Sequence, residues 1–227
     1  MILNIYKPKN WTSFDVVKKV KNVVGAKKAG HAGTLDPLAE GVLIVLTDSD
    51  TKKQDSFMKT TKEYKCEIGF GAESPTYDLE GELTFQKLPT KETLAKKLDD
   101  LLPSYKGEID QTVPPYSAKK VGGKPLYKKA RAGTLGDMPL PNKTVEILDF
   151  AIDSLEEQKV LGQSLLVLKC TITCSSGTYV RSIAHDLGKD LGVGGVLLKL
   201  MRTKVGDFTV EESKKIEELV LEFESLA

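Results

Sequence analysis

Segments typical of strands and segments typical of helices follow one another in this chain without a regular alternation. Strands are predicted at residues 2–6, 41–47, 62–70, 105–112, 143–152 and 164–174. Helices are predicted at residues 12–24, 90–102, 178–192 and 211–224, the last one acidic and amphipathic. Because a parallel sheet of βαβ units would alternate strand and helix, this order favours an α+β fold with a largely antiparallel, mixed sheet flanked by helices and loops.

Two of these segments carry especially clear local signals. Thr12 and Asp15 have the spacing of a capping box, and the apolar residues Phe14, Val17, Val20 and Val24 recur at helical intervals until Gly25. The run GVLIVLT at 41–47 is continuously apolar and rich in β-branched residues, which predicts a strand buried on both faces.

The length of 227 residues fits a single domain, and we expect one domain over residues 1–227. The segment at about 113–140 is rich in Pro, Gly and Lys and is the one long irregular stretch that the pattern predicts. Loops of this size within a domain are commonly functional.

The net charge is only +1, but the charges are placed unevenly. Residues 1–31 carry seven lysines against one aspartate, and residues 111–136 carry six basic residues and no acid. Residues 207–227 carry seven acidic residues against two lysines. Two basic blocks in one domain favour a polyanionic partner such as RNA, with the acidic end pointing away from it.

The remaining composition argues against several classes of protein. The three cysteines, Cys66, Cys170 and Cys174, form no CxxC pair and are expected to be buried and reduced. Without a His/Cys cluster, no metal site is expected. No apolar run approaches the roughly 18 residues of a membrane span, and the N-terminal segment is too short in apolar residues for a signal peptide, so we expect a cytoplasmic protein without membrane contact.

The stretch GHAGTLDPLAEG at residues 30–41 holds three glycines, His31 and the pair Asp36-Pro37. A P-loop is excluded, because Asp36 stands in the region where that motif needs a lysine followed by serine or threonine. Asp36 and Pro37 fit the N-cap and the first position of a helix. They also place an ionised carboxylate on a glycine-rich loop that a ligand can approach closely. The pattern by itself leaves both interpretations open.

The longer stretch GHAGTLDPLAEGVLIV resembles the catalytic motif of the TruB family of pseudouridine synthases. The resemblance continues in order through KPKNWTS, KEYKCEIGFG, PPYSAKKVGGKPLYKKAR, CSSGTYVRSIAHDLG and LMRTKVGDF, and covers about residues 1–210. It implies the pseudouridine synthase fold and an isomerase that converts a uridine in the T arm of transfer RNA to pseudouridine. The implied reaction requires no cofactor.

The resemblance implies catalytic roles for three residues. Asp36 matches the catalytic aspartate, which attacks the ribose anomeric carbon or acts as a base there while uracil departs. Arg181 matches the arginine that pairs with this aspartate and keeps it ionised. Tyr64 matches the tyrosine that stacks on the uracil ring and serves in proton removal.

The resemblance also implies contacts with RNA whose target base is flipped into the pocket. His31 matches a histidine that packs beside the flipped nucleotides, and Leu200 matches an apolar residue that packs against the base. The other implied RNA-binding residues are Lys19, Tyr116, Lys119, Lys120, Lys124, Lys128 and Tyr179.

The chain departs from the family pattern at two places. The glycine of the first motif is Asn10 here, and we expect that turn to differ in detail. Many family members continue into a C-terminal RNA-binding domain of the PUA type, whereas this sequence stops at Ala227. We therefore expect a weaker hold on RNA, with the basic blocks supplying more of the salt-sensitive affinity.

Other functions share some of these features. A guide-RNA-dependent pseudouridine synthase of the dyskerin type usually carries the C-terminal domain, and a catalytically silent RNA-binding or tRNA-folding protein has no need of Asp36. A glycosidase needs a second carboxylate, for which only Glu40, one helical turn from Asp36, is near. We expect a monomer that acts on tRNA without an obligate protein partner.

Overall fold

The computed structural model describes residues 1–136 and 138–225, so residue 137 of the predicted 113–140 loop lies outside the described residues. The chain divides into two compact units. Unit 1 consists of Met1–Lys65, Ile172–Gly177 and Lys199–Ala227, and unit 2 consists of Cys66–Thr171 and Thr178–Leu198. The single-domain organisation stays a prediction.

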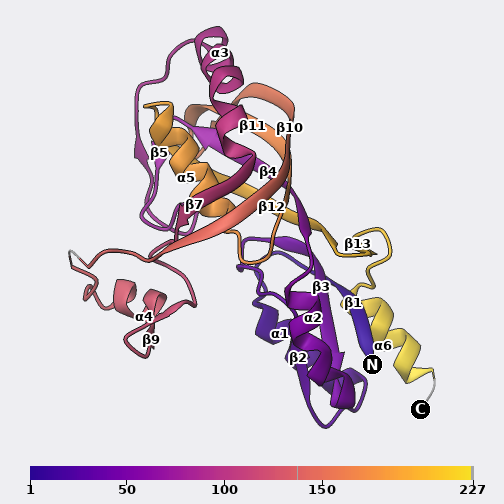
Figure 1. The fold of residues 1–227 in the computed structure, drawn as a ribbon. Helices are drawn as coiled ribbons and strands as arrows, with labels where there is room; N and C mark the ends of the chain where they lie inside the picture. Colours follow the sequence, from indigo (N-terminus) through magenta and orange to yellow (C-terminus); the bar gives the residue numbers. More distant parts are fainter. Residues whose placement is uncertain (137, 226–227) are drawn as a thin grey trace. The chain divides into compact units, whose positions relative to one another are not determined.

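Unit 1 is built around strand β3 (Glu40–Thr47), which pairs antiparallel with β1 (Ile2–Lys7) and β2 (Ala29–His31) (Figure 1). Its further elements are α1 (Ser13–Val23), a 3₁₀ turn at Asp48–Lys53, α2 (Gln54–Met58), β13 (Phe208–Thr209) and α6 (Ile216–Glu224). Two strand pairings bring the end of the chain back to its beginning: β12 (Gly195–Val205) runs parallel to β3 at Arg202↔Gly41 and antiparallel to β13.

The apolar run at 41–47 forms β3 as predicted, and both of its faces are buried. Leu43 and Val45 pack with the apolar side of α1, whereas Val42, Ile44 and Leu46 pack on the other face around Ala32 and Val205. Successive side chains of a strand point to opposite faces, so a strand between two apolar clusters must be apolar at every position.

The predicted capping box of α1 is confirmed. The Thr12 hydroxyl accepts a hydrogen bond from the Asp15 N–H, and the Asp15 carboxylate accepts one from the Thr12 N–H. The predicted apolar stripe is wrong at one position, because Phe14 is 70% exposed and the buried residues are Val16, Val17 and Val20. Two adjacent valines suffice to fill this face, so the stripe does not need Phe14.

Unit 2 contains the order β4-β11-β10-β7, in which β10 (Asn142–Val160) pairs antiparallel with β7 (Gly107–Thr112). Strands β4 (Lys62–Phe70), β11 (Gln163–Cys174) and β12 contribute residues to both units. The other elements are β5 (Ala72–Glu73), β6 (Thr84–Phe85), α3 (Lys91–Leu101), a 3₁₀ turn at Leu102–Tyr105, β8 (Lys120–Val121), β9 (Lys124–Pro125), α4 (Leu126–Arg131) and α5 (Val180–Asp190).

The fold confirms the α+β prediction with its largely antiparallel sheet, and most predicted elements are present. The three cysteines are buried and carry thiols rather than disulfides, as predicted, with the Cys66 and Cys170 sulfurs 3.3 Å apart on β4 and β11. None of the helices in the described part of the chain is long and apolar enough to cross a membrane.

Three local predictions are corrected. Asp36 and Pro37 start no helix and lie in a turn between β2 and β3. The last helix begins at Ile216 rather than near residue 211, because Lys215 is its N-cap and Glu218 accepts a hydrogen bond from the Lys215 N–H. The segment predicted to be irregular at 113–140 includes a short hairpin, β8 and β9, followed by α4, and extends away from the sheet of unit 2 (Figure 1).

Candidate active site

The loop that carries Asp36 is fixed through its main chain. The Ser13 hydroxyl accepts a hydrogen bond from the Leu35 N–H (2.9 Å) and donates one to the Leu35 carbonyl (3.0 Å). The Ala39 N–H closes a turn onto the Asp36 carbonyl at 3.1 Å. Leu35 and Leu38 are buried on either side of Asp36, which is itself partly exposed. The main chain of this loop is therefore held in place on both sides of the partly exposed Asp36.

The segment that follows β1 also binds the main chain of the Asp36 loop. The Asn10 N–H donates to the Pro37 carbonyl at 2.8 Å. Asn10 adopts a left-handed conformation (φ +67°), which glycine tolerates best and asparagine tolerates better than most residues. The departure from the family glycine is thus a residue with the same backbone freedom.

Lys7 is completely buried beneath this loop. Its ammonium donates to the carbonyls of Pro8 (3.1 Å), Pro37 (3.4 Å) and Ala39. Burial lowers the pKa of Lys7 to about 8, against the opposing influence of the Asp36 charge. A buried cation thus lies close enough to Asp36 to interact with its carboxylate.

Arg202 fastens both ends of the Asp36 loop. Its guanidinium donates from Nε to the Val42 carbonyl (2.8 Å) and from Nη2 to the Gly33 carbonyl (3.1 Å). The glycines make this approach possible: a Cβ at Gly41 would lie 2.3 Å from the Arg202 carbonyl oxygen, and one at Gly33 would lie 3.4 Å from Arg202 Nη1. Gly41 is therefore required by the close approach of the Arg202 main chain, whereas Gly33 is favoured by its left-handed backbone, at φ +98°.

Tyr64 lies on β4 and is buried near the same guanidinium. Burial raises the pKa of the Tyr64 hydroxyl, while the charge and a hydrogen bond of Arg202 lower it, and the Asp36 charge raises it. Tyr64, Arg202 and Asp36 are thus electrostatically coupled within unit 1.

The other residues predicted in unit 1 have simple environments. His31 lies on β2, partly buried; its Nδ1 has no hydrogen-bond partner, and burial lowers its pKa, followed by the charge of Arg202. Lys19 is exposed on α1, and Leu200 is buried on β12. Glu40 belongs to β3 and accepts a hydrogen bond from the Tyr6 hydroxyl at 2.9 Å, so it is not one helical turn from Asp36.

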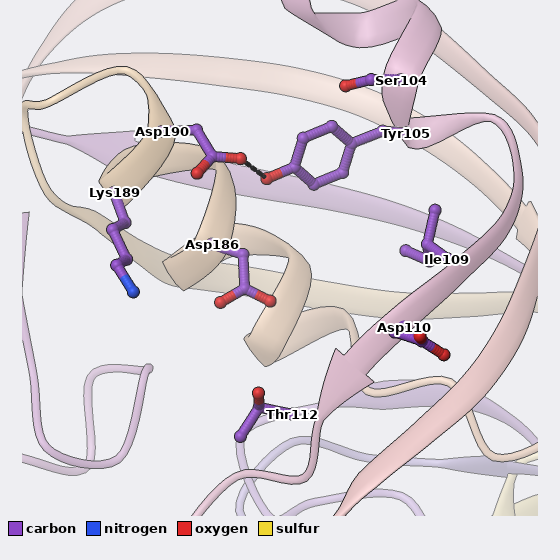
Figure 2. Close-up of a pocket in the computed structure, with 8 residues that line it drawn as sticks. All are labelled: Ser104, Tyr105, Ile109, Asp110, Thr112, Asp186, Lys189 and Asp190. Atoms are coloured by element: carbon purple, nitrogen blue, oxygen red, sulfur yellow. Dashed lines mark hydrogen bonds between the residues drawn. The ribbon is translucent and has the colours of Figure 1, made fainter.

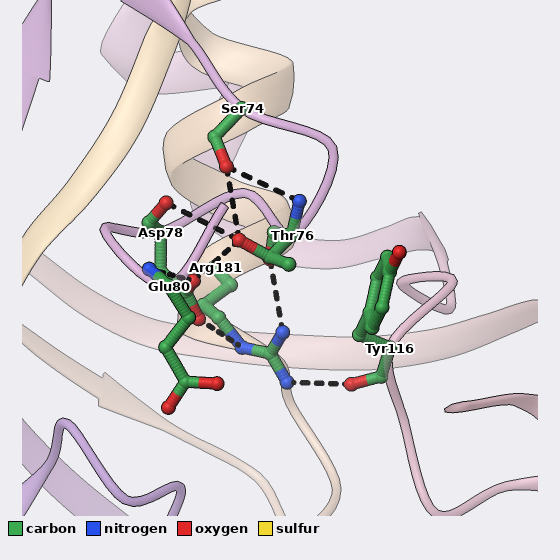
Figure 3. A network of polar contacts seen from close by, with 6 residues as sticks. All are labelled: Ser74, Thr76, Asp78, Glu80, Tyr116 and Arg181. Atoms are coloured by element: carbon green, nitrogen blue, oxygen red, sulfur yellow. Dashed lines mark hydrogen bonds and ion pairs between the residues drawn. The ribbon is translucent and has the colours of Figure 1, made fainter. Parts of the chain in front are cut away.

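In unit 2, Arg181 lies in the first turn of α5 and is 4% exposed (Figure 3). Its guanidinium donates to the carbonyls of Thr76 and Tyr116, each at 3.0 Å, and its Nε lies 3.5 Å from an oxygen of Asp78. A cation at a helix N-terminus faces the unfavourable end of the helix dipole, and the Asp78 carboxylate offsets this.

The turn that contains Asp78 is closely packed. The Thr76 hydroxyl donates to the Asp78 carboxylate at 2.6 Å, and the Glu80 N–H donates to it at 3.0 Å (Figure 3). Gly81 lets the chain close on itself, because a Cβ there would lie 2.4 Å from the Ser74 hydroxyl. The turn thus presents a carboxylate and a carbonyl to Arg181 in a fixed arrangement.

The predicted RNA-binding residues of unit 2 fall into two groups. Tyr116 contacts Arg181 through its carbonyl, and Tyr179 is the N-cap of α5, where its main chain is held by the Gln111 side chain at 2.7 and 3.0 Å. The side chains of the four lysines are exposed on or beside the β8–β9 hairpin and α4: Lys119, Lys120, Lys124 and Lys128.

A separate pocket of about 300 Å³ in unit 2 contains none of the predicted site residues (Figure 2). The Tyr105 hydroxyl donates to Asp190 there at 2.8 Å. Burial and the charge of Asp190 raise the pKa of Asp186 to about 6.

A family model described as the N-terminal domain of TruB family pseudouridylate synthases matches residues 21–180. A relative from Parabacteroides distasonis is 41% identical, with 96% of this chain and 91% of the relative covered. One from Clostridium tetani is 38% identical, with 96% and 72% covered, and both are named tRNA pseudouridine synthase B. The chain belongs to the TruB family of pseudouridine synthases.

Solved structures show the same fold in this TruB-family chain. A chain of an H/ACA RNP bound to a substrate RNA containing 2'-deoxyuridine is 23% identical with a TM-score of 0.67. A chain of a Cbf5-Nop10-Gar1 complex is 25% identical with the same TM-score of 0.67. The match covers 96% of this chain but about half of each of those chains, 52% and 53%.

Family membership confirms the resemblance, while the individual roles of the site residues stay predictions. Asp36, Tyr64, His31, Lys19 and Leu200 belong to unit 1, and Arg181, Tyr116, Tyr179 and the four lysines belong to unit 2. The predicted pairing of Asp36 with Arg181 is therefore carried forward as a proposal.

Sequence reasoning missed five residues that hold this TruB-family site: Lys7, Ser13, Thr76, Asp78 and Arg202. Lys7 and Ser13 stand in KPKNWTS, and Arg202 stands in LMRTKVGDF, so the motif resemblance already contained them. Asp78 stands in SPTYDLEG, a cluster of turn residues whose only signal is its composition.

Proposed function

We propose that this chain is a tRNA pseudouridine synthase that converts uridine 55 in the T arm of tRNA to pseudouridine. The observation that carries the proposal is the pair of relatives named tRNA pseudouridine synthase B, at 38–41% identity over 96% of the chain. The held Asp36 loop supports it, because a reacting group on a fixed loop needs little reorganisation when substrate binds.

In the proposed reaction the target base is flipped and Asp36 acts at its ribose, as nucleophile at the anomeric carbon or as base. The bond from the ribose to N1 breaks and uracil departs with the bonding electrons. Uracil turns and bonds to the sugar through C5; this step breaks the bond between Asp36 and the anomeric carbon, or, where Asp36 acts as base, Asp36 returns its proton to the sugar. The proton on C5 then passes by way of the Tyr64 hydroxyl to solvent, and N1 takes up a proton, so that Asp36 and Tyr64 end as they began. Arg181 pairs with Asp36 in this proposal and keeps it ionised.

The RNA is held in this proposal by His31, Leu200, Lys19, Tyr116 and Tyr179 and by the lysines of the β8–β9 hairpin and α4. Their exposed ammonium groups suit phosphates, which bind lysine as a point charge. The proposal also includes a cytoplasmic monomer that needs no protein partner or guide RNA.

The decisive experiment incubates the purified chain with an unmodified tRNA transcript and maps pseudouridine by chemical labelling. We expect a single product at uridine 55, and a transcript with cytidine at that position as the control without product. Tight binding of tRNA without product would overturn the enzyme and leave the silent RNA-binding protein. Product only after a guide RNA is added would favour the dyskerin-type alternative.

Asp36→Asn tests the reacting group. We expect turnover to disappear while tRNA binding is kept, because the amide has the same shape but cannot act as a carboxylate. Retained turnover would place the reacting group elsewhere.

The lysine contacts are tested by the salt dependence of tRNA binding. Changing Lys119, Lys124 and Lys128 to glutamine should reduce the slope of log K against log salt by about 1 for each lysine that contacts phosphate. The matched control changes three exposed lysines of α3, Lys91, Lys96 and Lys97, and should leave the slope unchanged. An equal effect of both triple variants would remove the hairpin and α4 from the RNA contact.

A further inference from the structure

Tyr77 has an unusual backbone conformation next to the residues that contact Arg181. Its φ of +65° is left-handed, a conformation that is unfavourable for a residue other than glycine. The conformation is held from both sides, since the Tyr77 N–H donates to the Ser74 carbonyl (3.0 Å) and the Leu197 N–H donates to the Tyr77 carbonyl (2.9 Å). The chain thus keeps a strained tyrosine between Thr76 and Asp78.

The ring of Tyr77 stacks on the imidazole of His185, with ring centres 3.9 Å apart and planes within 8°. His185 Nδ1 is buried and has no hydrogen-bond partner, so this nitrogen does not orient the ring, whereas the stack with Tyr77 contacts its face. Burial lowers the pKa of His185; Glu73 acts to raise it, and Lys189 acts to lower it further. The imidazole is therefore neutral at physiological pH.

His185 follows Arg181 by one helical turn, so both side chains lie on the same face of α5. Three consecutive residues of the turn contact this face. Thr76 and Asp78 bind the guanidinium, and Tyr77 between them stacks on His185. The stack is therefore a second attachment of the same turn to the same helix.

We propose that Tyr77 and His185 are positioning residues for Arg181. Their stack holds the 74–80 turn against α5, so that the Thr76 carbonyl and the Asp78 carboxylate orient the guanidinium. The consequence for catalysis rests on the proposed function, whereas the effect on Arg181 does not.

The two features of Tyr77 can be separated by substitution. Tyr77→Gly removes the ring and accommodates the left-handed backbone, so it loses the stack without added strain. Tyr77→Phe keeps both the ring and the backbone requirement. On the helix side, His185→Ala loses the stack at a good helix position, and His185→Phe keeps an aromatic ring. Leu79→Ala changes an exposed residue of the same turn and is the matched control.

The first measurement needs no RNA. The chain has three arginines, Arg131, Arg181 and Arg202, so the Nε–H region of a ¹⁵N NMR spectrum resolves Arg181. We expect exchange of its Nε–H with water to accelerate about 2- to 12-fold in Tyr77→Gly and His185→Ala. This range corresponds to the loss of the interaction energy of one aromatic pair. Tyr77→Phe and His185→Phe should restore slow exchange, and Arg202 should be unaffected. Unchanged exchange of Arg181 in both stack-deleting variants would overturn the proposal.

The second measurement is pseudouridine formation under single-turnover conditions. Tyr77→Gly and His185→Ala should lower the rate constant about 10- to 100-fold, the loss expected when a group in the site is misplaced by about 1 Å. Affinity for tRNA should change less than the rate constant, and Leu79→Ala should leave both unchanged. If the wild-type protein is active and Tyr77→Gly and His185→Ala have the same rate constant as wild type, the proposal is also overturned. An inactive wild type would overturn the proposed function, while the exchange experiment would still decide the role of the stack.

Discussion

Two buried arginines, one in each unit, are satisfied in different ways. Arg202 in unit 1 is 1% exposed and donates to the main-chain carbonyls of Gly33 and Val42. Arg181 in unit 2 also donates to carbonyls, but has the Asp78 carboxylate 3.5 Å from Nε. Among the residues that the structure describes, no carboxylate forms an ion pair with Arg202.

The difference determines what each cation can do. Carbonyl dipoles solvate the guanidinium of Arg202 but do not neutralise it, so its charge still acts on Tyr64 and His31. The charge of Arg181 is balanced by the Asp78 carboxylate, which Thr76 and Glu80 hold in the 74–80 turn. Unit 1 thus offers a net positive charge to groups near Asp36, and unit 2 offers a guanidinium in a defined orientation.

The largest loss of stability is expected from a side chain at Gly41, where the main chain of Arg202 on β12 lies against the glycine. Gly41→Ala would place a Cβ 2.3 Å from the Arg202 carbonyl oxygen in a residue with φ +102°. Main chain cannot move aside as a flexible side chain does, so we expect a loss of about 3 kcal/mol or more in the free energy of unfolding, measured by urea denaturation. Gly162→Ala, at φ +82° with open space around it, should lose only about 1–2 kcal/mol. Equal losses would contradict the close approach at Gly41.

Removing each arginine tests the comparison directly. Arg202→Met leaves two buried carbonyls without their donor and should destabilise by about 2–6 kcal/mol at both pH 5 and pH 8. Arg181→Met leaves the Asp78 carboxylate buried without the guanidinium and should destabilise by about 3–5 kcal/mol at pH 8.

The pH dependence separates the two variants. At pH 5 the Arg181→Met variant should recover stability, because a carboxyl that is buried without a cation takes up a proton more readily. Urea denaturation at the two pH values measures this. A pH-independent loss in Arg181→Met would show that Asp78 is not the group that balances Arg181.

Asp186 is a half-buried carboxylate in the pocket of unit 2, where the lining residues include a lysine but no arginine. Its pKa is raised to about 6, so the folded protein holds this proton more tightly than the unfolded chain does, and the stability it contributes is lost as pH rises toward 6 and above. Asp186→Asn should therefore raise the melting temperature by about 2–4 °C at pH 8 and have little effect at pH 4. Asp190→Asn is the contrasting variant, because it weakens the hydrogen bond from Tyr105 and should lower the melting temperature.

The smallest effect concerns the two histidines, one in each unit. The pKa values of His31 and His185 are both lowered by burial, so unfolded chains take up these protons first and stability is lost as pH falls below about 6.5. Arg202 lowers the pKa of His31 but not that of His185. In Arg202→Lys, which keeps the charge, both imidazole NMR titrations should resemble wild type, whereas in Arg202→Met only the His31 titration should move upward. A shift of both would mean a general loosening of the fold.

Local patterns predicted the elements wherever one segment determines its own structure. The buried strand at 41–47, the capping box of Thr12 and Asp15 and the reduced cysteines follow from periodicity, spacing and composition within a few residues. The pattern left open whether Asp36-Pro37 starts a helix, and the structure decides against it because the hydrogen bonds that shape this loop come from Ser13, Lys7, Asn10 and Arg202. Asp-Pro fits a helix start, but tertiary partners held it in a turn.

The family, the carboxylate of Asp36 for which the family resemblance implies a catalytic role, and the two basic segments could all be recognised in the order of the amino acids alone. Only the tertiary structure decided what holds that carboxylate and what Arg181 binds. Arg202 reaches carbonyls that lie 160 and 169 residues away in the chain, and Arg181 reaches Thr76 across 105 residues. Such contacts leave no periodic trace in the sequence, because their partners are main-chain groups that every residue carries. Gly41 is the visible sign of one close approach, and its cause appears only when the main chain of Arg202 is placed beside it.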